Sequence, residues 1–361
     1  ERIHQTLSTT RRGHPGSHRQ QPFTLTASHP TQSSSTASPS IAYFCMEFGL
    51  HQEFPIYAGG LGVLAGDILK AAGDQQRPFV GVGIFWNHGY TVQTLDDTGT
   101  PVDTFIPTSR AVLEPTGVET TVTIRGKDVP ITAHRVTAFN NATLYLLEPI
   151  HPDDQWVSKW LYGGSDDDRV AQEVLLGIGG VRVLQALGHP VDLYHFNEGH
   201  ALFAGLELIS QSMSEGLSYE AAKKAVKEKV VFTTHTPVPA GNEVHPIDRL
   251  IEQGAAVGGL TRAQLTELGG DPFQMTPAAL RLSRSANAVA NLHGETARKM
   301  WAQVAGAAPI HSVTNGVHLP TWQDQTIAAL NADAPQKLWA RHLELKRELL
   351  KAIHDMNGVQ L

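Results

Sequence analysis

Ile41-Ala-Tyr-Phe-Cys-Met-Glu-Phe48 is a short apolar and aromatic run, of the kind that forms a buried strand. A glycine-rich turn follows, Tyr57-Ala-Gly-Gly-Leu-Gly62, and the apolar spacing of Val63–Ala72 then suits a helix. The next segment, Pro78-Phe-Val-Gly-Val-Gly-Ile-Phe-Trp86, is a second run typical of a buried strand. Strand, turn, helix and strand in this order predict the βαβ unit of a parallel sheet.

The same alternation continues along the chain after one stretch of different character. Residues 102–147 contain β-rich alternating runs, such as Val118–Ile124 and Ile131–Thr137, which predict an antiparallel insertion. Beyond it we expect helices at Asp168–Leu187, His200–Ser212, Tyr219–Lys229 and Leu292–Trp301, and strands at Leu193–Asn197, Val230–Thr234, Ala286–Val289 and His311–Thr314. The pattern predicts an α/β protein with a Rossmann-like, doubly wound sheet and an antiparallel β insertion.

The composition argues against several classes of protein. The 361 residues include 28 Lys and Arg against 35 Asp and Glu, for a formal net charge of −7. No long basic stripe stands out, which disfavours nucleic acid as a partner, and no apolar run reaches the roughly 18 residues of a membrane span. The single cysteine, Cys45, excludes an intramolecular disulfide framework and a multi-cysteine zinc site. We expect a soluble, cytoplasmic protein that meets no membrane.

The first 40 residues differ from the rest. They carry four arginines, no lysine and one acidic residue, with Ser and Thr packed between prolines from Thr24 to Ser40. That composition suits a disordered or non-native tail, and an organellar transit peptide is the alternative. We therefore place residues 1–40 outside the fold.

Ligands of doubly wound sheets bind where the parallel strands end. Four loops expected at that edge hold unusual residues and should converge on one crevice: Gly59-Gly60-Leu61-Gly62, Asn197-Glu198-Gly199-His200, His235-Thr236-Pro237 and Asn315-Gly316-Val317-His318. The first loop leads into a helix, whose unpaired N–H groups and positive dipole end attract anions. Gly59 and Gly60 lack a Cβ that would hold a phosphate away, although a tight turn without a ligand is the alternative.

The second loop combines two histidines with a carboxylate. His195, Glu198 and His200 could suggest a metal site, but their spacing matches neither H-E-x-x-H nor H-x-x-E-H. Glu198 and His200 could instead bind a polar substrate, or cap and anchor the next helix. No metal-ligand set is predicted here.

The third and fourth loops add a histidine and an amide. His235 follows a buried strand and could bind a sugar hydroxyl or transfer a proton, while a buried histidine with internal partners is the alternative. Asn315-Gly316 is a turn signal that could equally place an amide on a ligand. The residues alone therefore predict a crevice suited to a phosphate and a polyhydroxylated ligand.

These residues, in this order, resemble the α-glucan (glycogen, starch and maltodextrin) phosphorylases, in particular their short bacterial type. The resemblance runs from about residue 41 to the C-terminus. Its blocks are Ile41–Leu50, Pro55–Asp67, Leu161–Gly164, Asn197–His200, Val231–Gly241, Leu280–Arg284, Leu292–Glu295 and Val313–His318.

The resemblance implies the N-terminal half of a GT-B-type glycosyltransferase fold, in which two Rossmann-like domains face one cleft. In that family a lysine of the C-terminal domain binds pyridoxal 5'-phosphate, and the motif around this lysine does not occur here. No cofactor-binding residue is therefore expected in this chain. The implied boundaries are 1–40 for the tail, 41–340 for the N-terminal phosphorylase domain, and 341–361 for a helix leading to an absent C-terminal domain.

The resemblance also implies roles for individual residues. Gly60 and Leu61 would present backbone amides to the substrate phosphate and sugar. His235 would be the catalytic residue, its carbonyl stabilising an oxocarbenium-like transition state, and with Asn315 it would hold the primary hydroxyl of the glucosyl unit. Further polar positions would line the cleft, namely Glu47, Glu198 and His200. The chain departs from the family after Leu161–Gly164, where Ser165 replaces the usual acidic residue.

The implied reaction is phosphorolysis of a terminal α-1,4-linked glucose to α-glucose 1-phosphate, with this chain inactive alone. The implied partners are an α-1,4-glucan, inorganic phosphate, a C-terminal phosphorylase domain and a second copy in a homodimer. Two other functions are the alternatives, a non-catalytic glucan-binding module and a metal-dependent hydrolase built on His195, Glu198 and His200.

Overall fold

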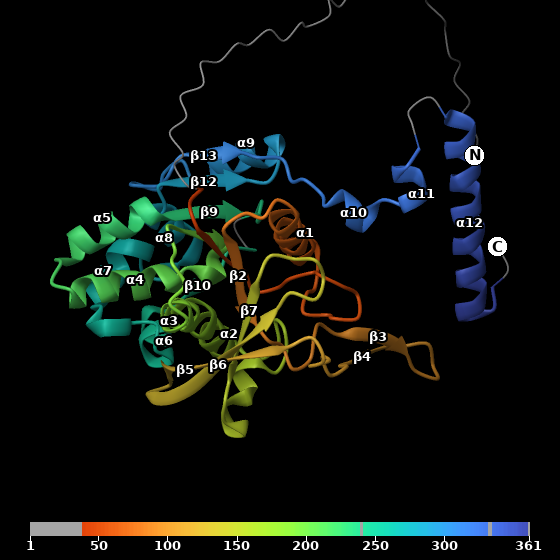
Figure 1. Cartoon of the computed structure of the whole chain (residues 1–361). Coiled ribbons are helices and arrows are strands. Elements are labelled where there is room, and N and C mark those ends of the chain that lie inside the picture. The colour runs from red at the N-terminus through yellow and green to blue at the C-terminus, as the bar shows by residue number, and fades with distance from the viewer. Residues whose placement is uncertain (1–37, 239–240, 331–333, 360–361) are drawn as a thin grey trace, which may run out of the picture. The chain divides into compact units, whose positions relative to one another are not determined.

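The computed structural model describes residues 38–238, 241–330 and 334–359. Most of the expected tail (1–40), and Pro239 and Ala240 of the third loop, lie outside the described residues. The described strands form one large sheet in the order β13-β12-β9-β8-β1-β2-β7-β6-β5, together with two small antiparallel sheets of two strands each, β3-β4 and β10-β11 (Figure 1). The strand bounds are β1 Ile41–Phe44, β2 Phe79–Ile84, β3 Val92–Leu95, β4 Pro101–Thr104, β5 Glu114–Ile124, β6 Lys127–Val136, β7 Leu144–Pro149, β8 Leu193–Asn197, β9 Val230–Thr234, β10 Val244–His245, β11 Phe273–Gln274, β12 Ser285–Ala288 and β13 Ile310–Ser312.

The first strands confirm the predicted βαβ unit. β1 and β2 pair in parallel, joined through helix α1 (Gly60–Asp74), and β1 also pairs in parallel with β8 on its other side. β9, β12 and β13 extend the parallel sheet beyond β8, whereas β2 and β7 extend it the other way. The winding direction therefore changes between β1 and β8, where an open α/β sheet forms a ligand crevice.

The region expected to be an antiparallel insertion divides into two parts. β5 and β6 pair antiparallel, and β6 pairs antiparallel with β7. β7, however, also pairs in parallel with β2 and so belongs to the central sheet. The prediction that the insertion extends to residue 147 is thus wrong, because it includes most of β7. Leu144–Pro149 is almost wholly buried, as the strands of a parallel sheet are.

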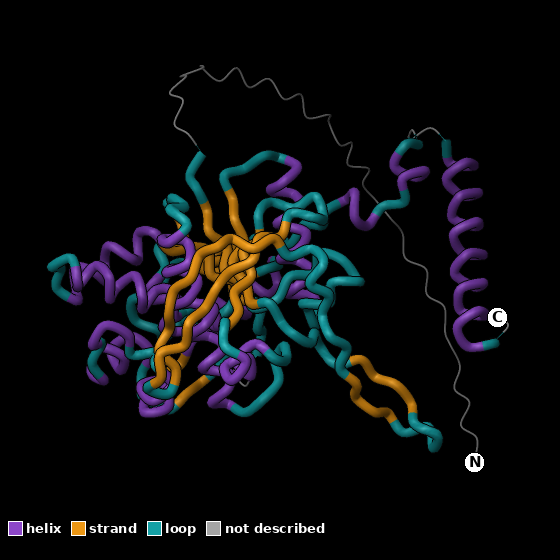
Figure 2. The backbone as a smooth tube through the Cα atoms, turned by 60° about the horizontal axis from the view of Figure 1, so that its bottom comes forward, coloured by secondary structure: helices purple, strands orange, loops and turns teal. Residues whose placement is uncertain are grey.

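Helices cover both faces of the sheet, as the alternating side chains of β2 show. On one face, a Cβ added to Gly81 would lie 3.0 Å from Leu69 of α1; on the other, Val82 lies close to Gly180. Figure 2 shows the strands running through the middle with helices to either side. The remaining helices are α2 Asp166–Val174, α3 Gly180–Ala186, α4 Phe203–Ser214, α5 Tyr219–Lys229, α6 Ile247–Gln253, α7 Arg262–Gly269, α8 Met275–Leu282, α9 Asn291–Met300, α10 Leu319–Trp322, α11 Gln325–Ala328 and α12 Pro335–Asn357.

The helix expected over residues 168–187 is interrupted. A π-helical turn, Leu175–Gly179, separates α2 from α3. A Cβ at Gly177 would lie 2.5 Å from the backbone nitrogen of Ala204, so this turn permits backbone-to-backbone packing against the start of α4. The apolar periodicity alone could not reveal the change in helical pitch.

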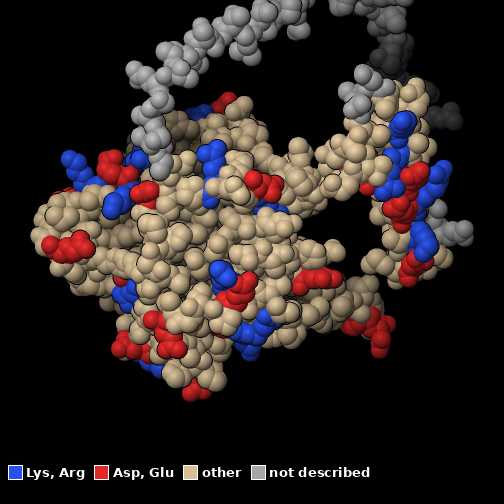
Figure 3. Space-filling view, in the orientation of Figure 1, with Lys and Arg blue, Asp and Glu red and all other residues tan. Residues whose placement is uncertain are grey.

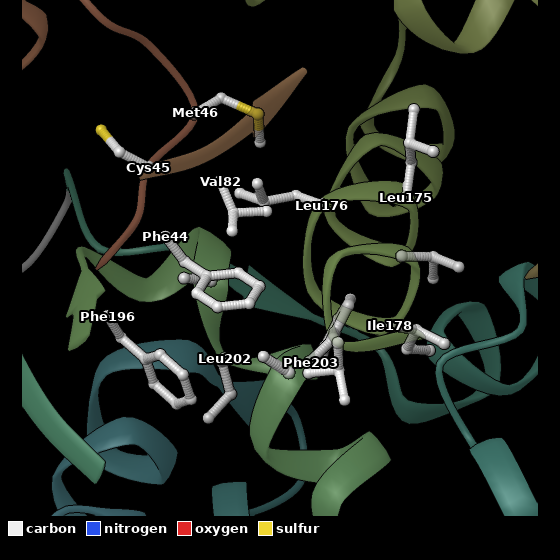
Figure 4. Close-up of a cluster of buried hydrophobic side chains, with 14 of the residues drawn as sticks. Phe44, Cys45, Met46, Val82, Leu175, Leu176, Ile178, Phe196, Leu202 and Phe203 are labelled. Atoms are coloured by element: carbon white, nitrogen blue, oxygen red, sulfur yellow. The ribbon is translucent and has the colours of Figure 1, made fainter. Parts of the chain in front are cut away.

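The core lies between the sheet and these helices. Buried side chains from β1, β2, β8, the π-helical turn and α4 meet there, among them Phe44, Val82, Leu176, Phe196 and Phe203 (Figure 4). Burial of such side chains contributes about 1.5–3 kcal/mol each. This packing holds β1 and β8 in register and thereby sets the spacing of the loops that follow them.

Two further features are the hydropathy of the described helices and the charge on one face of the molecule. Among the described helices, none combines the length and the apolar character needed to cross a bilayer. On the face drawn in Figure 3, basic and acidic side chains are interspersed.

Candidate functional site

The loops after β1, β8, β9 and β13 leave the same edge of the sheet, because these strands run in parallel. A cavity of about 230 Å³ lies at this edge. It is lined by Leu61, Tyr162, Arg169, Glu198, Gly199, His200, Thr236, Gly241, Asn242, Glu243, Met275 and Thr276. Three predicted site residues, Leu61, Glu198 and His200, are thus brought together here.

The glycine turn opens helix α1 at this edge. Gly59 is the N-cap of α1, with extended backbone and no side-chain cap, and the first turn of the helix holds no acidic residue. A Cβ on Gly59 or Gly60 would meet no atom within 4 Å, so open space lies beside them. The absence of a Cβ thus leaves this side of the helix end open to a ligand, although the Gly59 N–H itself donates to Glu47 (3.2 Å).

Glu47 supports this turn from below. Its Oε2 accepts hydrogen bonds from the N–H groups of Ala58 (2.6 Å) and Gly59 (3.2 Å), and its Oε1 accepts one from the Tyr162 hydroxyl (2.5 Å). A Cβ at Gly62 would lie 2.6 Å from the carboxylate, so glycine is needed for the close approach. Glu47 is buried and is not among the cavity-lining residues; it holds the glycine turn and Tyr162 in place.

Glu198 anchors the third loop. Its Oε1 accepts hydrogen bonds from the N–H of His235, from the N–H of Thr236 (2.9 Å) and from the Thr236 hydroxyl (3.2 Å). Its Oε2 accepts one from the Gly199 N–H (3.2 Å), so the anchoring alternative considered for this residue is realised. Burial raises the pKa of Glu198, although the N–H groups around it act in the opposite direction. Its backbone has φ +69°, a left-handed conformation that non-glycine residues seldom adopt.

His235 is oriented by neighbours from two strands. Its Nε2 contacts Oδ1 of Asn197, and the amide Nδ2 of Asn197 donates to the Sγ of Cys45 (3.1 Å). Asn197 Oδ1 accepts, so Nε2 of His235 carries the proton and Nδ1 is the acceptor. Burial and the nearby His293 lower the pKa of His235 to about 4, which makes the imidazole neutral at pH 7. His235 is outside the cavity-lining set, although Thr236 belongs to it.

His200 and Arg169 supply free donors inside the cavity. Arg169 lies 3.5 Å from Nδ1 of His200, so that Nδ1 accepts and Nε2 carries the hydrogen. Burial, reinforced by Arg169, lowers the pKa of His200 to about 3. Within the described residues, Nε2 of His200 and Nη1 of Arg169 are buried and have no hydrogen-bond partner. Two unpaired donors in one cavity suit a ligand rich in hydroxyl groups.

Asn315 lies apart from the cavity lining. It is exposed, and its backbone N–H donates to the carbonyl of Val289 (3.0 Å), just beyond β12. Val289 in turn donates its N–H to Nδ1 of His293, the residue whose proximity helps lower the His235 pKa. The loops of His235 and Asn315 are therefore linked through Val289 and His293, but the Asn315 side chain points into no described cavity.

The loop after Asn315 is fastened to helix α1. Asp67 accepts hydrogen bonds from the His318 N–H (3.0 Å) and from the Trp322 indole (2.8 Å). His318 also contacts Asp74 through Nε2 (2.8 Å). Helix α1 thus carries the glycine turn at its start and fixes the fourth loop along its length.

The proposed ligand set of a metal-dependent hydrolase does not assemble. Nε2 of His195 contacts the Thr233 hydroxyl (2.7 Å), and all four acceptor contacts of Glu198 go to protein N–H and O–H groups. No described group of metal-ligating atoms contains His195, Glu198 or His200. This alternative has no support from the described geometry.

Sequence reasoning missed Arg169, Tyr162 and Glu243, which line the cavity. Tyr162 belongs to the Leu161–Gly164 block, so its motif offered a signal; Arg169 and Glu243 offered none. Ser165, the departure from the family, is the N-cap of α2 and forms a capping box with Asp168. Asp166 and Asp167 both pair with Arg249, so this loop is engaged within the protein.

A larger cavity, of about 960 Å³, lies beside β2 and β7. Two aromatic rings line it, Phe85 and Trp156, and the guanidinium groups of Arg110 and Arg125 lie 4.5 and 4.2 Å from their centroids. Each of these rings thus has one face covered by a guanidinium group.

Comparison with known proteins finds relatives that share most of this chain. The chain is 34% identical to maltodextrin phosphorylase of Thermococcus litoralis over 357 residues, which cover 87% of this chain and 43% of the relative. It is 37% identical to glycogen phosphorylase of Mycobacterium tuberculosis over 319 residues, covering 78% of this chain and 37% of the relative. The chain is a relative of the α-glucan phosphorylases.

A third phosphorylase, that of Aquifex aeolicus, is 31% identical over 366 residues and 89% of this chain. The present chain spans about half the length of these three relatives, or less. No family model matches the chain. The homology covers 78–89% of this chain.

Proposed function

We propose that this chain forms one wall of the catalytic cleft of an α-1,4-glucan phosphorylase with a GT-B-type fold. The observation that carries the proposal is the cavity at the switch between β1 and β8, which joins Leu61, Glu198 and His200 and holds two free buried donors. The β5–β6 hairpin is the antiparallel insertion of that fold. The function rests also on the relatives' names, glycogen and maltodextrin phosphorylase.

The proposed reaction breaks the bond between C1 of the terminal glucose and the bridging O4, and forms a bond between C1 and phosphate oxygen. A proton passes to O4 of the shortened glucan. The N–H groups of Gly60 and Leu61 bind the substrate phosphate, since a helix N-terminus stabilises an anion. The neutral His235 accepts a sugar hydroxyl proton at Nδ1 as a hydrogen bond, and its carbonyl faces positive charge developing at C1.

Two donors orient the sugar, the neutral imidazole of His200 and the Arg169 guanidinium, whose charge is paired with Glu243. His200 donates from Nε2, and Asn315 holds the primary hydroxyl together with His235 after its side chain turns toward the ligand. Glu47 and Glu198 act through the backbone N–H groups that they bind. The neutral histidines add no positive charge that would compete with the helix end for phosphate, and the charge of Arg169 is paired with Glu243.

Pyridoxal 5'-phosphate, when bound, would supply the phosphate group that exchanges the proton with the substrate phosphate. The described residues do not fit its lysine attachment, since no lysine lines the cavity and the buried Lys70 donates to Thr321 (3.0 Å). We therefore assign the cofactor to a C-terminal phosphorylase domain, which is the proposed partner, with a homodimer as the further proposed assembly.

The test mixes the purified chain with the C-terminal part of a relative, pyridoxal 5'-phosphate, maltodextrin and phosphate, and follows glucose 1-phosphate. We expect product with the wild type, and a loss of about 100-fold or more with His235→Ala. His311→Ala changes an exposed histidine of β13 and should retain full activity.

Association of the two parts is measured in parallel by size-exclusion chromatography. A stable complex that releases no glucose 1-phosphate, yet retains maltooligosaccharide, would support a glucan-binding module instead. A complex in which His235→Ala works as well as the wild type would contradict the proposed site.

A further inference from the structure

A second cluster of ionisable side chains lies behind the cavity. Glu173 of α2, Glu243 of the loop after β9 and His245 of β10 each place one ligand atom within 4.8 Å of the others. Glu173 has no exposed surface and His245 is only 5% exposed. These residues come from segments about 70 positions apart, and the sequence predicted no metal ligands among them.

Arg169 occupies one side of this cluster and leaves the other side free. It donates to Oε1 of Glu243 from Nε (2.8 Å) and Nη2 (2.6 Å), and its Nε lies 3.5 Å from Oε1 of Glu173. The Oε2 atoms of both carboxylates have no hydrogen-bond partner in the described structure. Oε2 of Glu173 faces Nε2 of His245 at 3.7 Å, and neither nitrogen of that imidazole has a partner among described residues.

This cluster lacks hydrogen-bond donors for its carboxylate oxygens. A buried carboxylate without donors loses its hydration and receives nothing in return. Arg169 balances one of the two negative charges, and the second remains next to an imidazole that offers only a lone pair and one N–H. Either a proton or a cation must neutralise it, and an imidazole lone pair is a ligand for a metal ion.

We propose that Glu173, Glu243 and His245 bind a divalent first-row transition-metal ion, with Zn²⁺ the preferred species. Imidazole nitrogen and carboxylate oxygen are both zinc ligands, and tetrahedral bonds of 2.0–2.1 Å place ligand atoms about 3.4 Å apart. The 3.7 Å separation of Glu173 and His245 is close to that spacing. Arg169 orients both carboxylates from behind, as outer partners of metal ligands do.

The ion has a way in. A second cavity, of about 250 Å³, is lined by Asp166, Arg169, Glu243 and His245 among others, and so reaches two of the three ligands. Arg169 and Glu243 line both cavities. The bound ion would tie α2 to the loop after β9 and so fix one wall of the sugar cavity, independently of any phosphorylase activity.

The test uses the untagged, full chain, crystallised after exposure to Zn²⁺ and, separately, to Mn²⁺. We expect one anomalous-diffraction peak within about 2.0–2.2 Å of a Glu173 oxygen, a Glu243 oxygen and a His245 nitrogen. Isothermal titration with Zn²⁺ should show one site whose affinity falls at least about tenfold in His245→Gln and in Glu173→Gln.

His189→Gln is the matched control, because His189 also has a buried Nε2 without a partner but belongs to no described cluster of metal-ligating atoms. It should retain the wild-type affinity. The proposal would be overturned if no anomalous peak lay at the cluster, or if His245→Gln bound Zn²⁺ as tightly as the wild type. A proton would then be the group that neutralises the second carboxylate. Glu173→Gln keeps the volume of the side chain, and a urea denaturation curve checks that the variant is folded before its zinc affinity is compared.

Discussion

Two pairs of glutamates near one cavity are held in opposite ways. Glu47 and Glu198 each accept three or more hydrogen bonds, mainly from backbone N–H groups. Glu173 and Glu243 lie against each other and against Arg169, with oxygens that lack donors in the described structure. The carboxylates of the first pair receive their hydrogen bonds from the protein. The carboxylates of the second pair carry more negative charge than Arg169 alone neutralises.

The difference teaches what a buried carboxylate does in each place. Backbone N–H groups are fixed by the chain trace, so Glu47 and Glu198 determine the shape of the glycine turn and of the His235 loop. A charge cluster can instead take up a proton or a cation. The pKa values of the second pair move in opposite directions. Burial and Glu243 raise the pKa of Glu173, whereas Arg169, Glu173 and His200 lower the pKa of Glu243 against the effect of burial.

The largest expected effect comes from Glu198→Ala. It leaves the N–H groups of Gly199, His235 and Thr236 without their acceptor. We expect a loss of about 3–5 kcal/mol in the free energy of unfolding, measured by urea denaturation at pH 7. Glu215→Ala, an exposed acidic residue after α4, is the control and should change stability by less than about 0.5 kcal/mol. A loss below about 1 kcal/mol for Glu198→Ala would show that its contacts are not what holds the loop.

An intermediate effect concerns His200, which lies between the two pairs. Its pKa of about 3 is below the ordinary value of 6.5, so the unfolded chain binds the proton more tightly. Stability is therefore lost as pH falls below 6.5, and His200→Gln should lessen this slope by up to about 1.4 kcal/mol per pH unit. Urea titrations between pH 6.5 and 4.5 measure it, with His311→Gln as control. An unchanged slope would mean that His200 is already protonated or accessible to water.

The smallest effect is expected from Glu173→Gln in the presence of a chelator. Because its pKa is raised, Glu173 stabilises the fold when protonated and loses that contribution as pH rises above the ordinary carboxyl range. The variant should match the wild type near pH 4 and equal or exceed it, by up to about 1 kcal/mol, at pH 8. If the variant lost more than about 2 kcal/mol in the free energy of unfolding at pH 8, Arg169 would need the negative charge of Glu173. Glu173 would then be a stabilising carboxylate like Glu198.

Much of the fold was predictable because its strands are short, buried and separated by clear helices. The expected bounds of β8, α5 and β9 agree with the structure to the residue. β7 was misassigned, since a buried strand looks the same whether its neighbours run parallel or antiparallel to it. The π-helical turn was missed because its side chains stay apolar while only the hydrogen-bond pitch changes.

The candidate site was predictable in part for a related reason. The rule that parallel strands end at one edge brought Leu61, Glu198 and His200 to one place without any knowledge of side-chain contacts. It could not say that Glu47 and Glu198 would be occupied by backbone N–H groups. It also placed Asn315 in the crevice, whereas in the structure its side chain is exposed and only its backbone is fixed.

Local pattern determined the order of strands and helices, the glycine turn at the start of α1, and the family relationship, because each depends on residues close together in the chain. Only the tertiary structure decided which carboxylates have donors and that Arg169, Glu243 and His245 meet Glu173. Such meetings depend on segments about 70 residues apart, and the energy of a buried charge depends on every neighbour that packing brings to it.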